Sequence, residues 1–217
     1  ILLEHRVEAM VVHSKALDDK TLIDFAKQVP GFVLINRYIP EIANRCVWLD
    51  NVTGGRLMAE HAINQGHKNL AVISSQYRID DPNHRLEGIV NAVEAAKLSL
   101  PESMIEYATP DQEGGELAMQ NLLATGAEFT AVLAYNDAMA SGAMTMLQDH
   151  GIAVPEQVSV MGYDDVLLAK YCRPKLTTLR YPIEMMAAKA AELALKYAAG
   201  AKPCLLYTSP SPRDLKL

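Results

Sequence analysis

Two apolar runs of this chain each stop abruptly at a pair of polar residues. The run 130–135 ends at Asn136 and Asp137, and the run 158–163 ends at Asp164 and Asp165. In open α/β sheets, ligands bind beyond the carboxyl ends of the strands. Neither end carries a glycine-rich phosphate-binding sequence, so these amides and carboxylates favour hydroxyl groups over phosphates. The pattern predicts a site for a polar ligand, with a sugar as the natural candidate.

An enzyme would use the same carboxylates differently. Asp137, Asp164 and Asp165 could act as acid-base groups, but the chain has no GxSxG, Walker A, HExxH or strand-linked GxGxxG motif. Its six histidines are scattered without ligand spacing. We therefore predict a binding protein that is not an enzyme, with no metal and no cofactor.

Strand and helix patterns alternate along most of the chain. This alternation predicts an α/β protein whose parallel sheets are built from strand–helix–strand units. The segment 36–45 is expected to be an irregular loop. The predicted strands are 8–13, 31–35, 46–49, 69–74, 104–108, 130–134 and 158–162, and the predicted helices are 18–29, 51–65, 83–97, 113–124 and 137–149.

The pattern also suggests two lobes. Residues 1–48 would form the N-terminal lobe and 49–178 the C-terminal lobe, and the strand and alanine-rich helix of 179–203 would return to the first lobe. The chain lacks a starting methionine and opens like the last turn of a helix, so we expect this first lobe to be truncated. Residues 204–217 resemble a translated sequencing adapter, and we exclude them from the fold prediction.

Composition restricts the partners. The 217 residues carry a formal net charge of -6, with a pI near 5.5, so no basic field is available to hold nucleic acid. Cys46, Cys172 and Cys204 form no CxxC pair, which favours a reducing compartment and predicts a cytoplasmic location. No apolar run is long enough to span a membrane, so no membrane partner is expected.

Several motifs together resemble one protein family. They are QGHKNLAVI (65–73), RLEG (85–88), AVLAYND (131–137), VSVMGYDD (158–165) and PKLTTLR (174–180). In type and order they are similar to the effector-binding domain of LacI/GalR-type transcriptional regulators. Segments 13–17, 34–37, 49–51 and 179–182 resemble the galactose-responsive members most closely.

The resemblance implies several further properties. The fold would be the type I, two-lobed periplasmic-binding-protein-like fold, with a sugar effector, D-galactose, held in the cleft between the lobes. A helix-turn-helix headpiece preceding this segment would bind operator DNA, and the full-length protein would be a homodimer. Sugar binding would favour a conformation with lower operator affinity.

Three residues match ligand-binding positions of that family. Arg85 would donate from its planar fork to sugar hydroxyls, although it could instead be a surface arginine paired with an acidic neighbour. Asn136 and Asp164 would hydrogen-bond the sugar at the strand ends. Their alternative role is helix capping and turn formation.

Four weaker candidates lie toward the first lobe. Asn36 follows the strand 31–35, and could equally form a turn. Trp48 could stack on a pyranose ring or simply pack in the core. Tyr181 falls at a position that lines the cleft in relatives, and His13 ends the first strand, where a packed or solvated histidine is the other interpretation.

A periplasmic sugar-binding protein of a transport system shares this fold and remains the alternative function. The sequence upstream of the chain would separate the two hypotheses, because one requires a helix-turn-helix and the other a secretion signal.

Overall fold

The computed structural model describes residues 7–202 and 215–216, and it divides the chain into two compact units. Of the described residues, 7–50 and 182–202 form the first unit, and 51–181 with 215–216 form the second. The chain therefore passes between units after residues 50 and 181, slightly later than the predicted positions after 48 and 178. Residues 1–6 and most of the adapter-like tail lie outside the described residues.

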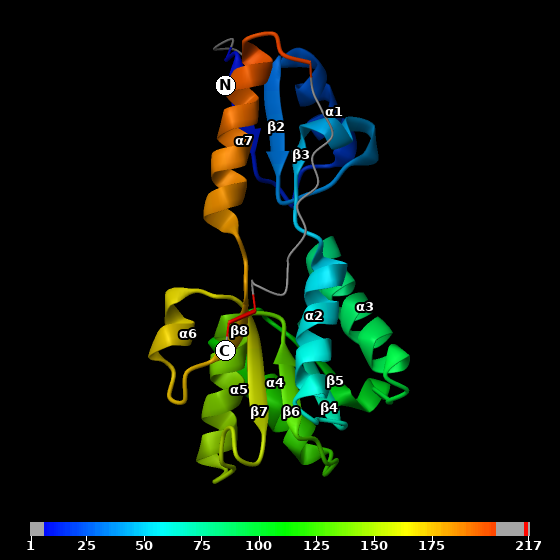
Figure 1. Ribbon diagram of the computed structural model, residues 1–217, viewed down its shortest axis with the longest axis vertical. Helices are drawn as coiled ribbons and strands as arrows, with labels where there is room; N and C mark the ends of the chain where they lie inside the picture. Colours follow the sequence, from blue (N-terminus) through cyan, green and yellow to red (C-terminus); the bar gives the residue numbers. More distant parts are fainter. Residues whose placement is uncertain (1–6, 203–214, 217) are drawn as a thin grey trace. The chain divides into compact units, whose positions relative to one another are not determined.

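A parallel three-stranded sheet forms the centre of the first unit (Figure 1). Its strands are β1 (Ala9–Val12), β2 (Gly31–Ile35) and β3 (Cys46–Val47), in that order. Every residue of β2 is buried, as expected for a central strand with both faces covered. The sheet is flanked by α1 (Asp19–Gln28), the 3-10 helix η1 (Pro40–Arg45) and α7 (Ile183–Ala198).

Local contacts determine where α1 and η1 form and how α7 packs on the sheet. Asp18 caps α1 by accepting a hydrogen bond from the Thr21 amide at 2.7 Å. Helix α7 crosses β2 so closely that a Cβ on Gly31 would collide with the Ala194 carbonyl. The segment predicted as an irregular loop contains η1, because Pro40 suits a first helical turn and Ile42 is buried in the core.

The second unit contains a larger sheet, in the order β5-β4-β6-β7-β8-β9 (Figure 1). All of its pairings are parallel except that between β8 and β9. The strand predicted at 179 is part of β8, which pairs with β7 in this unit rather than returning to the first. The strands are β4 (Leu70–Ser75), β5 (Ile105–Ala108), β6 (Ala131–Ala134), β7 (Ser159–Asp164), β8 (Thr177–Arg180) and β9 (Leu215–Lys216).

Helices cover both faces of this sheet. Alternate residues of β6 point in opposite directions: Val132 packs in the cluster formed with α4 (Gln112–Ala124) and α5 (Asp137–Asp149). Leu133 instead borders a small cavity beside α2 (Asn51–Asn64) and α3 (Asp80–Ala95). Two short helices complete the unit, η2 (Glu102–Met104) and α6 (Leu167–Tyr171).

The α/β class with parallel sheets is confirmed, with local differences from the prediction. Helix α3 begins at Asp80 rather than at residue 83, because Pro82 lies in the first turn, where a missing N–H costs no helical bond. Helix α6 was not predicted, since five residues are too few to show a helical period. Among the described residues, no helix is long and apolar enough to cross a membrane.

Candidate ligand-binding site

Arg85 lies at the centre of a polar cluster at the carboxyl edge of the second sheet. Its side chain is buried, and the residue is only 6% exposed. Nε donates to the Asn51 side-chain oxygen at 2.8 Å, and Nη1 donates to the Tyr135 carbonyl at 2.6 Å. The alternative interpretation of Arg85 as a surface residue is therefore wrong.

Two aromatic rings hold the guanidinium in place. The Arg85 Cζ atom lies 3.6 Å from the centroid of the Tyr163 ring and 4.5 Å from that of Tyr135. These cation-π contacts and the two hydrogen bonds fix a side chain that would otherwise have many rotamers. The result is a donor fork with a defined direction.

Asp164 provides the negative charge of the cluster. Its Oδ1 lies 3.8 Å from Arg85 Nη2, close enough for an ion pair but too far for a hydrogen bond. Both groups consequently keep hydrogen-bonding capacity for a third partner. A hydroxyl group, which donates and accepts at once, can satisfy the carboxylate and the guanidinium together.

The electrostatics of Asp164 follow from its surroundings. Burial raises the pKa of its carboxyl to about 6; the Arg85 charge opposes this rise, and Asp81 adds to it. The side chain is still 31% exposed, so it is accessible to a ligand. Its backbone φ is 109°, in a region that L-residues seldom adopt.

Helix packing places Arg85 at this edge. A Cβ on Gly55 of α2 would collide with the Arg85 carbonyl, and a Cβ on Gly88 of α3 would collide with the Val52 carbonyl. The two helices therefore cross with their backbones in contact, and only glycine fits at these positions. This explains the RLEG motif structurally: its glycine allows the contact, and its arginine reaches the sheet edge.

Asn136 performs the capping role that was its alternative interpretation. Its Oδ1 accepts from the Met139 amide at 2.8 Å as the N-cap of α5, and its Nδ2 donates to the Pro110 carbonyl at 2.9 Å. A side-chain amide has two N–H donors and two lone pairs, so one of each remains available. A role in ligand binding stays a prediction.

Tyr181 follows β8 and belongs to the same electrostatic cluster. Burial raises the pKa of its hydroxyl above the usual range, and the nearby Asp81 charge raises it further. The buried hydroxyl has no hydrogen-bond partner among the described residues. It is therefore a further neutral group able to donate to a ligand.

Four residues of this cluster were missed by the sequence analysis. Tyr135 and Tyr163 each stand immediately before a predicted site residue, which is a signal that could have been used. Asn51 and Asp81 gave no such signal, because they lie in the first turns of α2 and α3 and meet only in the folded chain. The Asn51 amide donates to Asp81 at 3.3 Å and so links the two helices.

Polar residues also meet at the carboxyl ends of β1 and β2 in the first unit. His13 Nε2 lies 3.4 Å from Asn36 Nδ2, and the Lys15 ammonium donates to the Asn36 carbonyl at 2.6 Å. Asn36 has a φ of 59°, a left-handed conformation that asparagine tolerates better than most residues. The structure thus brings two of the predicted residues together, with His13 exposed.

Trp48 packs against the hydrophobic core of the first unit and remains partly exposed. Its ring lies 4.9 Å from that of Tyr38, at an angle of 48°. Packing thus accounts for this position, and stacking on a sugar stays a prediction.

Several known proteins are similar to this chain in sequence and in structure. Residues 59–210 match the family model of the periplasmic binding protein-like domain. The crystal structure of a LacI-family transcriptional regulator from Burkhoderia phymatum is 31% identical, has a TM-score of 0.81, and is matched over 94% of this chain and 74% of that one. The chain belongs to the LacI family.

Other members of the LacI family are also similar. The HTH-type transcriptional regulator GalS of Salmonella typhimurium is 50% identical over 200 residues, which are 92% of this chain but only 59% of GalS. A sugar-binding LacI-family regulator from Escherichia coli, solved in complex with phosphate, is 28% identical with a TM-score of 0.90. It is matched over 97% of this chain and 76% of that one. The predicted family and fold are thereby confirmed.

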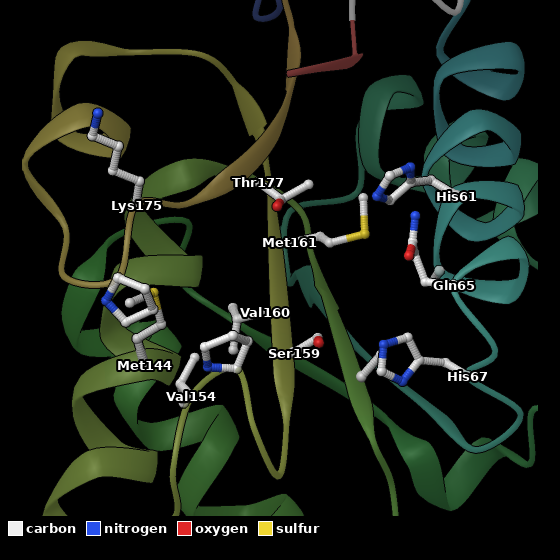
Figure 2. Close-up of a pocket in the computed structure, with 14 residues that line it drawn as sticks. His61, Gln65, His67, Met144, Val154, Ser159, Val160, Met161, Lys175 and Thr177 are labelled. Atoms are coloured by element: carbon white, nitrogen blue, oxygen red, sulfur yellow. The ribbon is translucent and has the colours of Figure 1, made fainter. Parts of the chain in front are cut away.

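This LacI-family chain also has a cavity of about 390 Å³ toward the opposite edge of the second sheet (Figure 2). Ser159 and Thr177, at the starts of β7 and β8, line it together with His61 and Gln65 from α2. In Figure 2, the side chains of His61 and Gln65 point toward the sheet. None of the predicted site residues lines this cavity, so it provides a control position for binding experiments.

The absence of a metal site and of catalysis stays a prediction for this LacI-family domain. Within residues 7–202, no three His, Cys, Asp or Glu side chains are grouped so as to hold a metal ion. Asp137, one candidate acid-base group, is fully buried, with both carboxylate oxygens hydrogen-bonded. The relatives reported above are transcriptional regulators, which fits a protein that is not an enzyme.

Proposed function

We propose that this chain is the sugar-sensing, effector-binding part of a DNA-binding transcriptional repressor that responds to D-galactose. The observation that carries this proposal is the buried Arg85 fork held 3.8 Å from the Asp164 carboxylate. Vicinal hydroxyls of a sugar match such a donor and acceptor pair. Asn136 and Tyr181 would add a donor or acceptor at the same edge.

The regulatory part of the proposal draws on the relatives. GalS is an HTH-type transcriptional regulator, and the chain spans 59% of its length. With a net charge of -6, the residues of this chain are unsuited to hold DNA by phosphate contacts. We therefore assign operator binding to a headpiece outside these residues, in a cytoplasmic homodimer.

The mechanism is thermodynamic linkage. If the sugar binds better to the conformation that has low operator affinity, then sugar and DNA oppose each other by one coupling free energy, typically about 1–3 kcal/mol. No covalent step is required. The alternative, a periplasmic sugar-binding protein, is less favoured, because the similar proteins named above are transcriptional regulators.

Calorimetric titration of D-galactose into the protein tests the effector assignment, with D-glucose and D-fucose as comparison ligands. We expect saturable binding of D-galactose that Asp164→Ala abolishes, because the carboxylate acceptor is lost. Gln65→Ala, in the cavity of Figure 2, is the matched control and should bind like the original chain.

Two results would count against this proposal. A well-folded protein that binds none of the three sugars would remain a LacI-family domain with a different effector. Binding that Gln65→Ala removes but Asp164→Ala does not would move the site to the cavity of Figure 2. The predicted contacts His13, Asn36 and Trp48 of the first unit are tested separately by their own variants.

A further inference from the structure

Asp137 is a buried carboxylate that the proposed sugar site does not itself use. It is the first residue of α5 and has no exposed surface. Its Oδ1 accepts a hydrogen bond from the Thr178 hydroxyl at 2.5 Å, and its Oδ2 accepts from the Val166 amide at 2.8 Å. Burying a carboxylate is costly, so its presence here requires an explanation beyond packing.

The turn that follows β7 is conformationally strained. Asp164 has a φ of 109° and Asp165 a φ of 57°, and neither is a glycine. Such conformations persist only where surrounding contacts enforce them, and they occur often at ligand sites. This turn directs the Asp164 side chain toward Arg85.

Asp137 and Thr178 hold two successive amides of this turn. The Val166 N–H donates to Asp137, while the Asp165 N–H donates to Thr178 Oγ1 at 3.3 Å. The Thr178 hydroxyl in turn donates to Asp137. The Asp137 carboxylate therefore holds the Val166 amide directly and the Asp165 amide through Thr178.

Strand β7 passes very close to the same carboxylate. A Cβ on Gly162 of β7 would collide with Asp137 Oδ1. Outside the buried network, Arg180 donates to the Asp165 carboxylate at 3.0 Å, and the Tyr181 amide donates to the Asp164 carbonyl at 3.2 Å. The turn is thus held by hydrogen bonds to Asp137 and to residues in and directly after β8.

We propose that Asp137 is a positioning residue that holds the turn 164–166, with its positive φ at Asp164 and Asp165, so that the Asp164 carboxylate faces the ligand. Asp137 itself does not touch the sugar. The consequence for affinity rests on the proposed function, whereas the effect on the turn can be measured without any ligand.

The ligand-free test is amide hydrogen exchange in the full chain. Asp137→Ala removes the acceptor of the Val166 amide and the anchor of Thr178, so exchange at residues 165 and 166 should become at least about tenfold faster. Asp137→Asn retains one acceptor and gains one donor for Thr178, and should keep most of the protection. Unchanged protection of both amides in Asp137→Ala would overturn the proposal, whether or not the protein binds sugar.

Leu147→Ala is the matched control for a general loss of stability. Leu147 is fully buried in the hydrophobic core and lies ten residues further along the same helix. We expect this variant to lower the unfolding temperature but to leave sugar affinity and the relative protection of residues 165 and 166 unchanged. If it reproduces the effects of Asp137→Ala, the role of Asp137 is merely structural.

Sugar titration supplies the second readout. Asp137→Ala should weaken D-galactose binding by about tenfold or more, and Asp137→Asn should restore it to within a few-fold. Because Asp137 acts through Asp164, adding Asp137→Ala to a weakly binding Asp164→Asn variant should cost much less affinity than it costs in the original chain. Fully additive losses would contradict the positioning role.

Absence of sugar binding in the original chain would reject the proposed function and leave the exchange experiment to decide on the turn.

Discussion

In the second unit, the Arg85 guanidinium is buried, donates two hydrogen bonds and contacts two tyrosine rings. In the first unit, by contrast, the exposed His13 ring meets Asn36 at a single distance of 3.4 Å. Both sets lie at the carboxyl ends of parallel strands, yet only one is held rigidly before a ligand arrives. Preorganised groups lose less entropy on binding, so we expect the second unit to supply most of the affinity and the selectivity.

The largest effect is expected from Arg85→Ala. The change removes the guanidinium that donates hydrogen bonds to the Asn51 side chain and to the Tyr135 carbonyl. It also leaves the Asp164 carboxylate without its positively charged partner. Breaking a fully buried ion pair typically costs about 3–5 kcal/mol of stability; because the Asp164 side chain is 31% exposed, we expect a smaller loss of stability here, together with the loss of sugar binding. Calorimetry and thermal unfolding would measure the two effects. Arg56→Ala, which removes a half-exposed pair with Glu60, is the control and should change neither.

The next effect concerns stability and pH at Asp137. Burial raises its pKa from the usual 3.8 to about 7, so the folded state keeps a proton that the unfolded state has already lost. The free energy of unfolding should therefore decrease as pH rises from 4 to 7, and level off above it. Asp137→Asn removes this titration and should be more stable than the original chain at pH 8, by at most about 4 kcal/mol.

Urea unfolding at pH 5 and pH 8 measures this difference. Parallel pH dependence of the two proteins would show that Asp137 keeps an ordinary pKa in the folded chain. The Leu147→Ala variant, which carries no titratable change, should follow the pH dependence of the original chain.

A smaller effect is expected from the titration of Asp164. Its pKa is raised to about 6 by burial, so the carboxylate that accepts from the sugar is lost as pH falls through that value. Affinity for D-galactose should decrease by about tenfold between pH 7.5 and pH 5. In Asp164→Asn, binding should be weak at both pH values and independent of this group. Constant affinity of the original chain over that range would mean that the ionised form is not required.

The smallest effect is expected from Asn36→Gly in the first unit. Glycine accepts the φ of 59° without strain, so this change tests the side-chain amide alone. A single hydrogen bond contributes about 1 kcal/mol, which predicts a loss of affinity of about fivefold. A loss as large as that in Asp164→Ala would contradict the expected difference between the units, and His13→Ala would then show whether its neighbour contributes equally.

The elements could be predicted because their signals are local. The run of apolar residues in β6 and the Asp18 cap of α1 both act within a few residues, and both are present where the sequence indicated. Helix α6 was missed because its five residues span little more than one turn. The start of α3 was displaced, because a proline that usually breaks a helix is tolerated in its first turn.

The candidate site was predicted in part, for a different reason. Asp164 and Asn136 were found because a strand end is visible in sequence, and Arg85 was found by family resemblance. The residues that surround them could not be predicted, because they are distant in the sequence. Asn51 is 34 positions from Arg85, and Thr178 is 41 from Asp137. Such contacts depend on how helices and strands pack, which no local pattern encodes.

The sequence by itself determined the α/β class and the polar character of the strand ends, because both follow from residue type and short-range spacing, and it indicated the family through its resemblance to known motifs. Tertiary structure decided that Arg85 is buried, that Asn136 is occupied as a helix cap, and that Asp137 supports the turn of Asp164. These properties depend on burial and on hydrogen bonds between distant segments. Desolvation and the exact partner of each polar group arise only when the sheet and its helices close around them.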